Sequence, residues 1–258
     1  MSRRIAGWAA AGCVLALSGP ARAADEEIQV YMDEIGPRHA PTLDVHLNYV
    51  PDGRLRPDYP GQQASDGRFR ITPEWAYALS PNLELGAYLP LAEIDRRGDV
   101  EVGGVKGRVK WVAPRAAGQA WFWGLNFEIG RVRHDLDINP WNAELKGIWG
   151  VRRGPWTLAA NLNLDWVVSG PDQGAPPELQ VALKAAYAMN AETSVGIETY
   201  NGVGTTRSLG RLGRQDNQTF LVIDRGFRTW DVNFGVGYGY GAPEDRWIVK
   251  AVVGVPIG

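Results

Sequence analysis

The chain has 258 residues, a formal net charge of −2 and one cysteine, with 32 glycines and 11 tryptophans. A net charge near zero argues against a nucleic-acid partner, because proteins that bind nucleic acid usually carry an excess of basic residues. The sequence holds no apolar run of the ~20 residues that a membrane-spanning helix requires, so we exclude a helical membrane protein.

The N-terminus has the pattern of a secretory signal peptide. Arg3 and Arg4 precede a small, apolar run over residues 5–17, and Ala21-Arg22-Ala23 follows as a cleavage site. A lipoprotein signal ending at Cys13 is less favoured, because the apolar run continues beyond that cysteine. We therefore expect residues 1–23 to be removed on export. The mature chain then has no cysteine and forms no disulfide.

Residues 24–41 carry a mixed pattern, in which Ile28, Val30 and Met32 alternate with polar residues. We expect an N-terminal arm here, which forms an extra strand or a plug. Clear alternation begins at Leu43 and recurs to the end of the chain, so residues 42–258 are expected to form one domain. The expected strands are 43–49, 71–78, 83–89, 105–111, 123–130, 143–149, 156–166, 178–187, 194–199, 219–223, 230–240 and 247–255.

The pair of segments within residues 177–200 shows the alternation most clearly. Leu179, Val181 and Leu183 fall on one face of the first strand, while Glu178 and Lys184 fall on the other. A soluble sandwich would turn such an apolar row inward, whereas a membrane barrel would turn it to lipid and enclose the charges.

The lengths of the connections favour the barrel. Connections after odd-numbered strands are mostly long and polar, and those after even-numbered strands are short, as in outer-membrane barrels with extracellular loops and periplasmic turns. Eight tryptophans also fall on the apolar face, several at strand ends where a ring can lie at the lipid headgroups. These are Trp75, Trp111, Trp123, Trp149, Trp156, Trp166, Trp230 and Trp247. A general preference of tryptophan for strands and cores is the competing explanation.

Four stretches of the chain, 71–91, 124–130, 144–150 and 180–204, carry a family resemblance; the first reads ITPEWAYALSPNLELGAYLPL. They resemble a bacterial outer-membrane family labelled "MetA-pathway of phenol degradation". The resemblance covers most of the mature chain and implies a membrane β-barrel, sometimes described as a transporter of aromatic compounds. Its motifs specify structure more than chemistry.

If lipid covers the apolar rows, the polar rows line the lumen, and both signs of charge are interleaved there. The expected lumen residues are Asp44, His46, Glu74, Glu84, Lys106, Arg108, Lys110, Asn126, Glu128, Glu144, Lys146, Asn161, Asn163, Asp165, Glu178, Lys184, Glu198, Asp231, Asn233 and Lys250. Charges on neighbouring strands are expected to pair, because unpaired buried charges are costly. The pairs either nearly fill the lumen of a plugged structural barrel or line a narrow aqueous path that selects solutes.

An outer-membrane lipid hydrolase or acyltransferase is a further alternative. His46 lies beside Asp44 on one strand face, and His134 lies near Asp135 and Asp137 in a loop. No serine in a recognisable nucleophile motif accompanies them, and the loop residues are an incomplete ligand set. We therefore expect no catalytic residues, cofactor or metal site.

These observations together predict an antiparallel, up-and-down barrel of about twelve strands in the outer membrane of a Gram-negative cell. The expected activity is that of a passive channel or uptake pore for small solutes, with aromatic compounds suggested by the resemblance. The expected partners are outer-membrane lipid, the solute and lipopolysaccharide, which the Arg-rich residues 207–214 could contact through its phosphates. The sequence does not define an oligomeric state.

Overall fold

The computed structural model describes residues 27–89, 92–94, 100–101, 103–211, 214–241 and 245–257. The expected signal peptide, residues 1–23, lies outside the described residues. No helix in these ranges is both long and apolar enough to cross a membrane.

The described chain consists of β-strands, turns and loops, with no α-helix. Twelve long strands form the wall, and three short strands extend its margins. The wall strands are β1 (Pro41–Asp52), β2 (Phe69–Ser80), β3 (Leu83–Tyr88), β6 (Gly104–Val112), β7 (Trp121–Val132), β8 (Trp141–Arg153), β9 (Trp156–Ser169), β10 (Glu178–Ala188), β11 (Thr193–Thr205), β13 (Asp216–Gly226), β14 (Asp231–Gly241) and β15 (Trp247–Pro256). The short strands are β4 (Ala92–Ile94), β5 (Val100–Glu101) and β12 (Ser208–Leu209).

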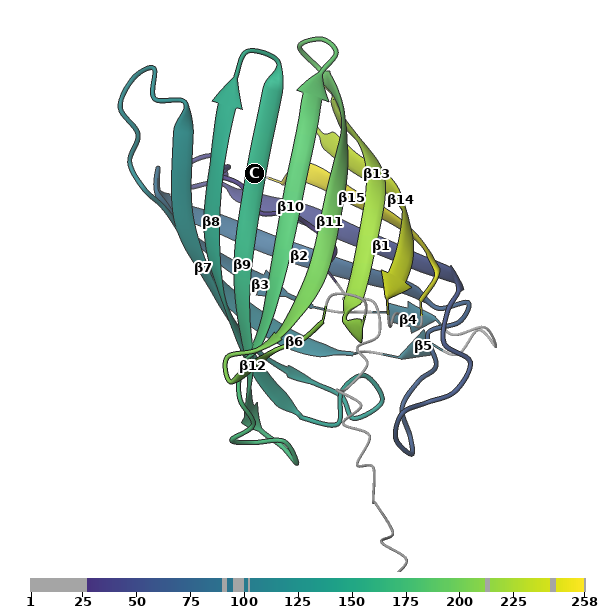
Figure 1. Ribbon diagram of the computed structural model, residues 1–258. Coiled ribbons are helices and arrows are strands. Elements are labelled where there is room, and N and C mark those ends of the chain that lie inside the picture. The colour runs from purple at the N-terminus through teal and green to yellow at the C-terminus, as the bar shows by residue number, and fades with distance from the viewer. Residues whose placement is uncertain are drawn as a thin grey trace, which may run out of the picture.

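The sheet closes on itself because β1 pairs with both its sequence neighbour and the last strand. Leu43 lies opposite Trp75 of β2 on one side and opposite Val255 of β15 on the other. Every other wall strand pairs antiparallel with the wall strands before and after it in sequence. The result is the up-and-down barrel of Figure 1, so the predicted fold class is confirmed.

Alternation along each strand separates an apolar outer face from a polar inner face. Leu183 is 44% exposed, whereas Lys184, the next residue of β10, is 7% exposed. On β11 the neighbours Ile197 and Glu198 are 48% and 1% exposed. A soluble protein rarely leaves an apolar surface of this extent uncovered, so the outer face fits hydrocarbon.

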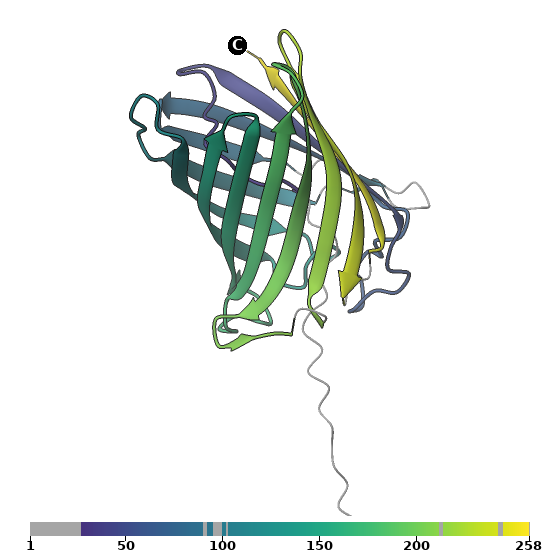
Figure 2. The ribbon, with the colours of Figure 1, turned by 45° about the horizontal axis from the view of Figure 1, so that its top comes forward.

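Most connections at one end of the barrel are shorter than those at the other, with the β6–β7 connection as an exception. The pairs β2–β3, β8–β9 and β10–β11 are joined by short turns, while β1–β2 and β9–β10 are joined by longer loops at the opposite end. Figure 2 shows the C-terminus at the end that carries the short turns. In outer-membrane barrels the end with the short turns faces the periplasm and the longer loops face outward, so we call the long-loop end of this barrel its outer end.

Aromatic residues stand at strand ends on the outer face. Trp121, Trp156 and Trp247 are the first residues of β7, β9 and β15, and all three are about half exposed. Trp156 and Tyr187 meet edge to face with their ring centroids 5.0 Å apart, an arrangement suited to the interface between lipid headgroups and hydrocarbon.

Glycines on the inner face leave room for aromatic rings from adjacent strands. A Cβ at Gly237 would collide with the ring of Phe220, and a Cβ at Gly150 would collide with Phe122. Both phenylalanines are fully buried inside the barrel. The lumen is therefore partly filled by apolar rings as well as by charged side chains.

Candidate functional site: the lumen and its N-terminal segment

The residues expected in the lumen differ in how deeply the structure buries them. Thirteen are buried, namely His46, Glu74, Glu84, Arg108, Lys110, Asn126, Glu128, Lys146, Asn161, Asn163, Lys184, Glu198 and Lys250. Six are half-buried, namely Asp44, Lys106, Glu144, Asp165, Glu178 and Asn233. Asp231 is exposed at the start of β14, the end of that strand near the short turns.

One charge cluster surrounds Arg108 of β6. Its guanidinium forms ion pairs with Glu74 of β2 and with Glu84 of β3, the latter at 2.8 Å. Glu74 also meets His46 Nε2 at 3.1 Å. The ion pair between Arg108 and Glu84 is of the kind expected from the order of the strands. His46, in contrast, contacts Glu74 of the next strand and not Asp44 of its own strand.

A second cluster surrounds Glu198 of β11. This carboxylate lies between Lys184 of β10, at 3.0 Å, and Lys250 of β15, whose ammonium also donates to it. All three side chains are almost fully buried, so each charge depends on the others for compensation. Lys184 has a second partner in Asp224, also at 3.0 Å.

Residues 27–36 lie inside the barrel and bind its wall through backbone groups. Asn161 accepts a hydrogen bond from the Tyr31 N–H at 2.7 Å and donates one to the Tyr31 carbonyl at 2.9 Å. Lys250 donates to the Ile28 carbonyl at 2.8 Å, and Lys110 donates to the Glu34 carbonyl at 2.7 Å. The segment joins no strand of the sheet. Side chains of the wall therefore satisfy its backbone.

Tyr31 is the most heavily contacted residue of this segment. Its ring faces three cations, with Lys146 Nζ 4.0 Å and Lys110 Nζ 5.3 Å from the ring centroid, and Arg108 is the third. Its hydroxyl meets the Tyr88 hydroxyl and lies 3.3 Å from Glu128 Oε1. Burial, and then neighbouring carboxylates, raise the pKa of Tyr31 well above its ordinary value, so it remains a neutral phenol.

Apolar contacts hold the same segment from its other side. Ile28 and Val30 are each 3% exposed and belong to one buried cluster with Phe122, Phe220 and Ile248 of the barrel wall. Burying two aliphatic side chains contributes roughly 3–6 kcal/mol before the entropy of ordering the segment is subtracted.

Ion pairs fix the segment where it leaves the barrel near the short turns. Asp33 pairs with Arg115, at 2.7 Å, and with Arg152, which also reaches Glu34 at 2.6 Å. Both arginines lie at the short-turn ends of neighbouring hairpins. Since these pairs are partly exposed, each contributes modestly, and they mainly set the position at which the segment leaves the barrel.

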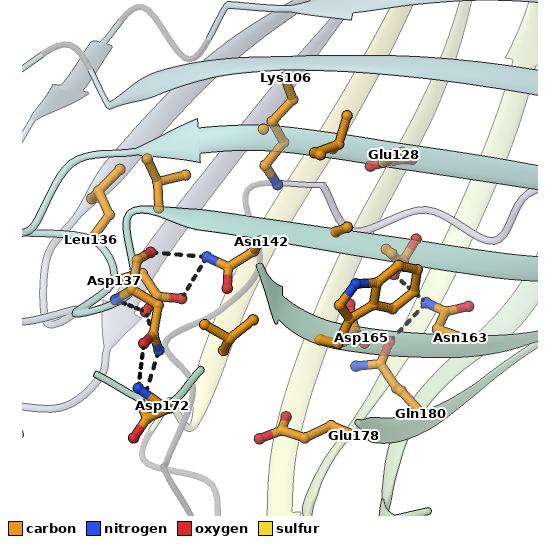
Figure 3. A pocket seen from close by; sticks show the side chains of 18 of the residues that line it. Lys106, Glu128, Leu136, Asp137, Asn142, Asn163, Asp165, Asp172, Glu178 and Gln180 are labelled. Carbon is orange, nitrogen blue, oxygen red and sulfur yellow. Dashed lines mark hydrogen bonds between the residues drawn. The ribbon is translucent and has the colours of Figure 1, made fainter. Parts of the chain in front are cut away.

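A cavity of about 560 Å³ lies between the inner face of β7–β10, the outer loops and the start of the described segment at Glu27. Its described lining holds eight carboxylates and three basic side chains, Arg70, Lys106 and Lys146. The carboxylates are Glu27, Asp58, Glu128, Asp137, Glu144, Asp165, Asp172 and Glu178. Figure 3 shows Lys106, Glu128, Asp165 and Glu178 around this space.

Lys146 forms ion pairs with this acidic wall. Its Nζ is 2.9 Å from Glu144 and 4.0 Å from Glu128. Glu27 lies nearby; burial, and then the negative charges of Glu128 and Glu74, raise its pKa well above the ordinary value. The floor of the cavity therefore favours a protonated Glu27 or a positive charge beside it.

The histidines form no catalytic arrangement in the described part of the chain. His46 is buried against Glu74, whereas His134 lies in an exposed loop with its Nε2 3.3 Å from the Pro60 carbonyl. Neither hydrogen-bonds to a serine among the described residues. Nor does any group of three or more His, Cys, Asp or Glu side chains in the described ranges have the geometry to hold a metal ion.

The wall residues that bind residues 27–36 were not predicted from the sequence. Ile28 and Val30 alternate with polar residues, but such a short pattern suits an edge strand as well as a segment inside the barrel. Arg115 and Arg152 were not expected to take part, because they lie next to turns and carry no motif. The sequence did contain one signal for these contacts: residues 27–34 are acidic, and lysines were expected on the inner face of the wall.

Comparison with known proteins identifies the fold but not a family. No family model matches the chain, and no curated protein matches it in sequence. The phenol-degradation family suggested by the resemblance is therefore not confirmed.

Solved structures of outer-membrane channels share the architecture. The COG4313 outer membrane channel from Pseudomonas putida F1 superposes with a TM-score of 0.62 at 13% identity, covering 89% of this chain and 99% of that one. The KdgM porin gives 0.55 at 9% identity and the NanC porin 0.54 at 8%, each covering 84% of this chain and 99% of the porin. This chain therefore has the closed, antiparallel barrel fold found in outer-membrane porins and channels.

Proposed function

We propose that this chain is an outer-membrane channel for small solutes, in which residues 27–36 occupy the lumen and limit passage. The observation that carries the proposal is the orientation of the wall. Apolar side chains cover the outside of a closed barrel, while hydrogen-bonded polar groups line the inside and a cavity of about 560 Å³ lies among the outer loops. The similar barrels named above are porins and channels, which supports the same activity.

The contacts of residues 27–36 suit a segment that can be displaced. Its backbone bonds go to the side chains of Asn161, Lys250 and Lys110, and water can replace each of these partners. A segment bound by the continuous hydrogen bonds of a sheet would be harder to release. Solutes then pass when the segment shifts within the lumen or leaves it.

The Gram-negative outer membrane is the location that we propose. An exposed apolar wall with tryptophans at the strand ends supports it. Contact with lipopolysaccharide phosphates is part of the same proposal, supported by Arg207 and Arg211, which are exposed in the connection between β11 and β13.

Two classes of solute are candidates for passage through the channel. Aromatic compounds are suggested only by the sequence resemblance, whereas one similar structure is the KdgM porin in complex with disordered oligogalacturonate, a polyanion. The acidic cavity of this chain opposes passage of such an anion.

Recording of single channels in planar bilayers tests the proposal. We expect the refolded chain to give discrete conductance steps, and the Asn161→Ala variant to give larger or more frequent steps because it releases Tyr31. If both proteins are verifiably folded by heat-modified gel migration and both remain electrically silent, the channel function is wrong.

A further inference from the structure

A row of carboxylates crosses four adjacent strands on the inner face of the barrel. Glu128 of β7 lies opposite Glu144 of β8, Glu144 lies opposite Asp165 of β9, and Asp165 lies opposite Glu178 of β10. Like charges directly opposite each other destabilise a sheet, so four in succession are an unusual arrangement. Neighbouring strands are about 5 Å apart, which makes the row roughly 14 Å long.

All four carboxylates line the outer cavity. Lys146 lies beside one half of the row, close to Glu128 and Glu144. Among the residues that the structure describes, the lining of the cavity carries eight carboxylates against three basic side chains. Its field therefore attracts positive charge and excludes anions.

Buried acceptors without donors provide a second, independent indication. Asn163 is 5% exposed and lines the cavity, and its Nδ2 donates to Glu144 Oε2 at 2.9 Å and to Gln180 Oε1 at 3.2 Å. Within the described part of the chain its Oδ1 has no hydrogen-bond partner, and neither has Glu27 Oε1 at the floor of the same cavity. The amide oxygen of Asn163 accepts hydrogen bonds, so a ligand that satisfies it must carry N–H or O–H donors.

A single metal ion does not fit these carboxylates. Within the described residues, no three acidic or histidine side chains come close enough together to hold one. Acidic groups spread along a row suit an extended cation whose charges are separated by a few carbon atoms.

We infer that the outer cavity is a binding site for small organic cations with more than one ammonium group, and that the channel prefers cations to anions. The selectivity rests on the proposed channel function, whereas the binding site does not. One ammonium group lies between Asp165 and Glu178, and a second approaches the acceptor of Asn163. A volume of about 560 Å³ accommodates an aliphatic diamine.

Two probes of equal length and opposite charge test the binding site by titration calorimetry on the folded, detergent-solubilised barrel. The cation is 1,4-diaminobutane and the anion is succinate. We expect heat of binding for the diamine only, and an affinity roughly fivefold weaker in Asp165→Asn or Glu178→Gln, as expected for losing one screened charge contact. Glu192→Gln, in the exposed β10–β11 turn, is the matched control and leaves binding unchanged. Equal binding of both probes, no diamine binding, or unchanged binding in both cavity variants overturns the inference.

Channel recording in a salt gradient separates this inference from the proposed function. If the wild-type protein conducts and prefers potassium to chloride, and the double variant Asp165→Asn/Glu178→Gln loses that preference, both are supported. If the channel conducts but prefers chloride, or if its ion preference is the same in the wild-type protein and the double variant, the inferred selectivity is wrong and the channel function stands. If the folded protein does not conduct, the channel function fails, and the calorimetry alone decides whether the cation site exists.

Discussion

Asn161 of β9 binds both backbone polar groups of Tyr31, although the two residues are 130 positions apart in sequence. One amide side chain thus makes the pair of hydrogen bonds that a neighbouring strand would make. This contact anchors residues 27–36 at the centre of the lumen, beside the cations that surround the Tyr31 ring.

Asn161→Ala is expected to loosen residues 27–36 without disturbing the wall. Two hydrogen bonds at about 1 kcal/mol each correspond to roughly a 30-fold shift toward the released segment. Single-channel recording would show more frequent or larger openings than in the wild-type protein. Asn190→Ala, in the exposed β10–β11 turn, is the control and should leave the openings unchanged. Identical behaviour of the two variants would show that Asn161 does not hold the segment.

Tyr31 variants separate the contribution of its ring from that of its hydroxyl. Tyr31→Phe keeps the ring against Lys146 but loses the contacts with Tyr88 and Glu128, whereas Tyr31→Leu loses both. A cation–π contact between desolvated groups contributes about 1–2 kcal/mol, so we expect openings to increase from wild type to Tyr31→Phe to Tyr31→Leu. An identical effect of the two variants would assign the binding to the hydroxyl alone.

Closure is expected to weaken as the pH rises. Burial and the charges of Glu128, Glu74 and Glu144 raise the pKa of Glu27 in the docked segment, while Lys146 acts in the opposite direction. A raised pKa favours docking fully below the carboxyl's ordinary value of about 4.3, and this contribution is lost as pH rises through the higher docked value. Openings recorded from mildly acidic to alkaline buffer should increase in the wild-type protein. Glu27→Gln should remove most of the change, and an unchanged slope in that variant would contradict this role.

Sequence alternation was sufficient to predict the wall, because one residue in two must face lipid. Leu183 and Lys184 show this directly, and the segment with the least clear phase, 219–223, still lies within a strand. The short strands β4 and β12 were not predicted, because they extend loops whose composition gives no alternation. Tyr31 could not be placed either, since a residue bound through its backbone leaves no pattern in its own neighbourhood.

The buried triad of Lys184, Glu198 and Lys250 makes a prediction about stability. Glu198→Gln removes the carboxylate that contacts two buried ammonium groups, and although Lys184 keeps a second partner in Asp224, we expect a loss of about 3–5 kcal/mol in unfolding free energy. The exposed pair of Glu192 and Arg225 is the comparison, and Glu192→Gln should cost less than about 1 kcal/mol. Urea unfolding of the barrel in detergent or lipid vesicles measures both. Equal losses would mean that the triad is not the stronger contact.

The most direct test of the account is the conductance of the folded chain in a planar bilayer, compared with that of a chain lacking residues 27–36. We predict discrete steps from the intact protein and a larger, more persistent conductance once the segment is absent, because the lumen then loses Tyr31 and its neighbours. Equal conductance from the two proteins would contradict the role of the segment. Silence from both, with the barrels shown to be folded, would contradict the channel itself.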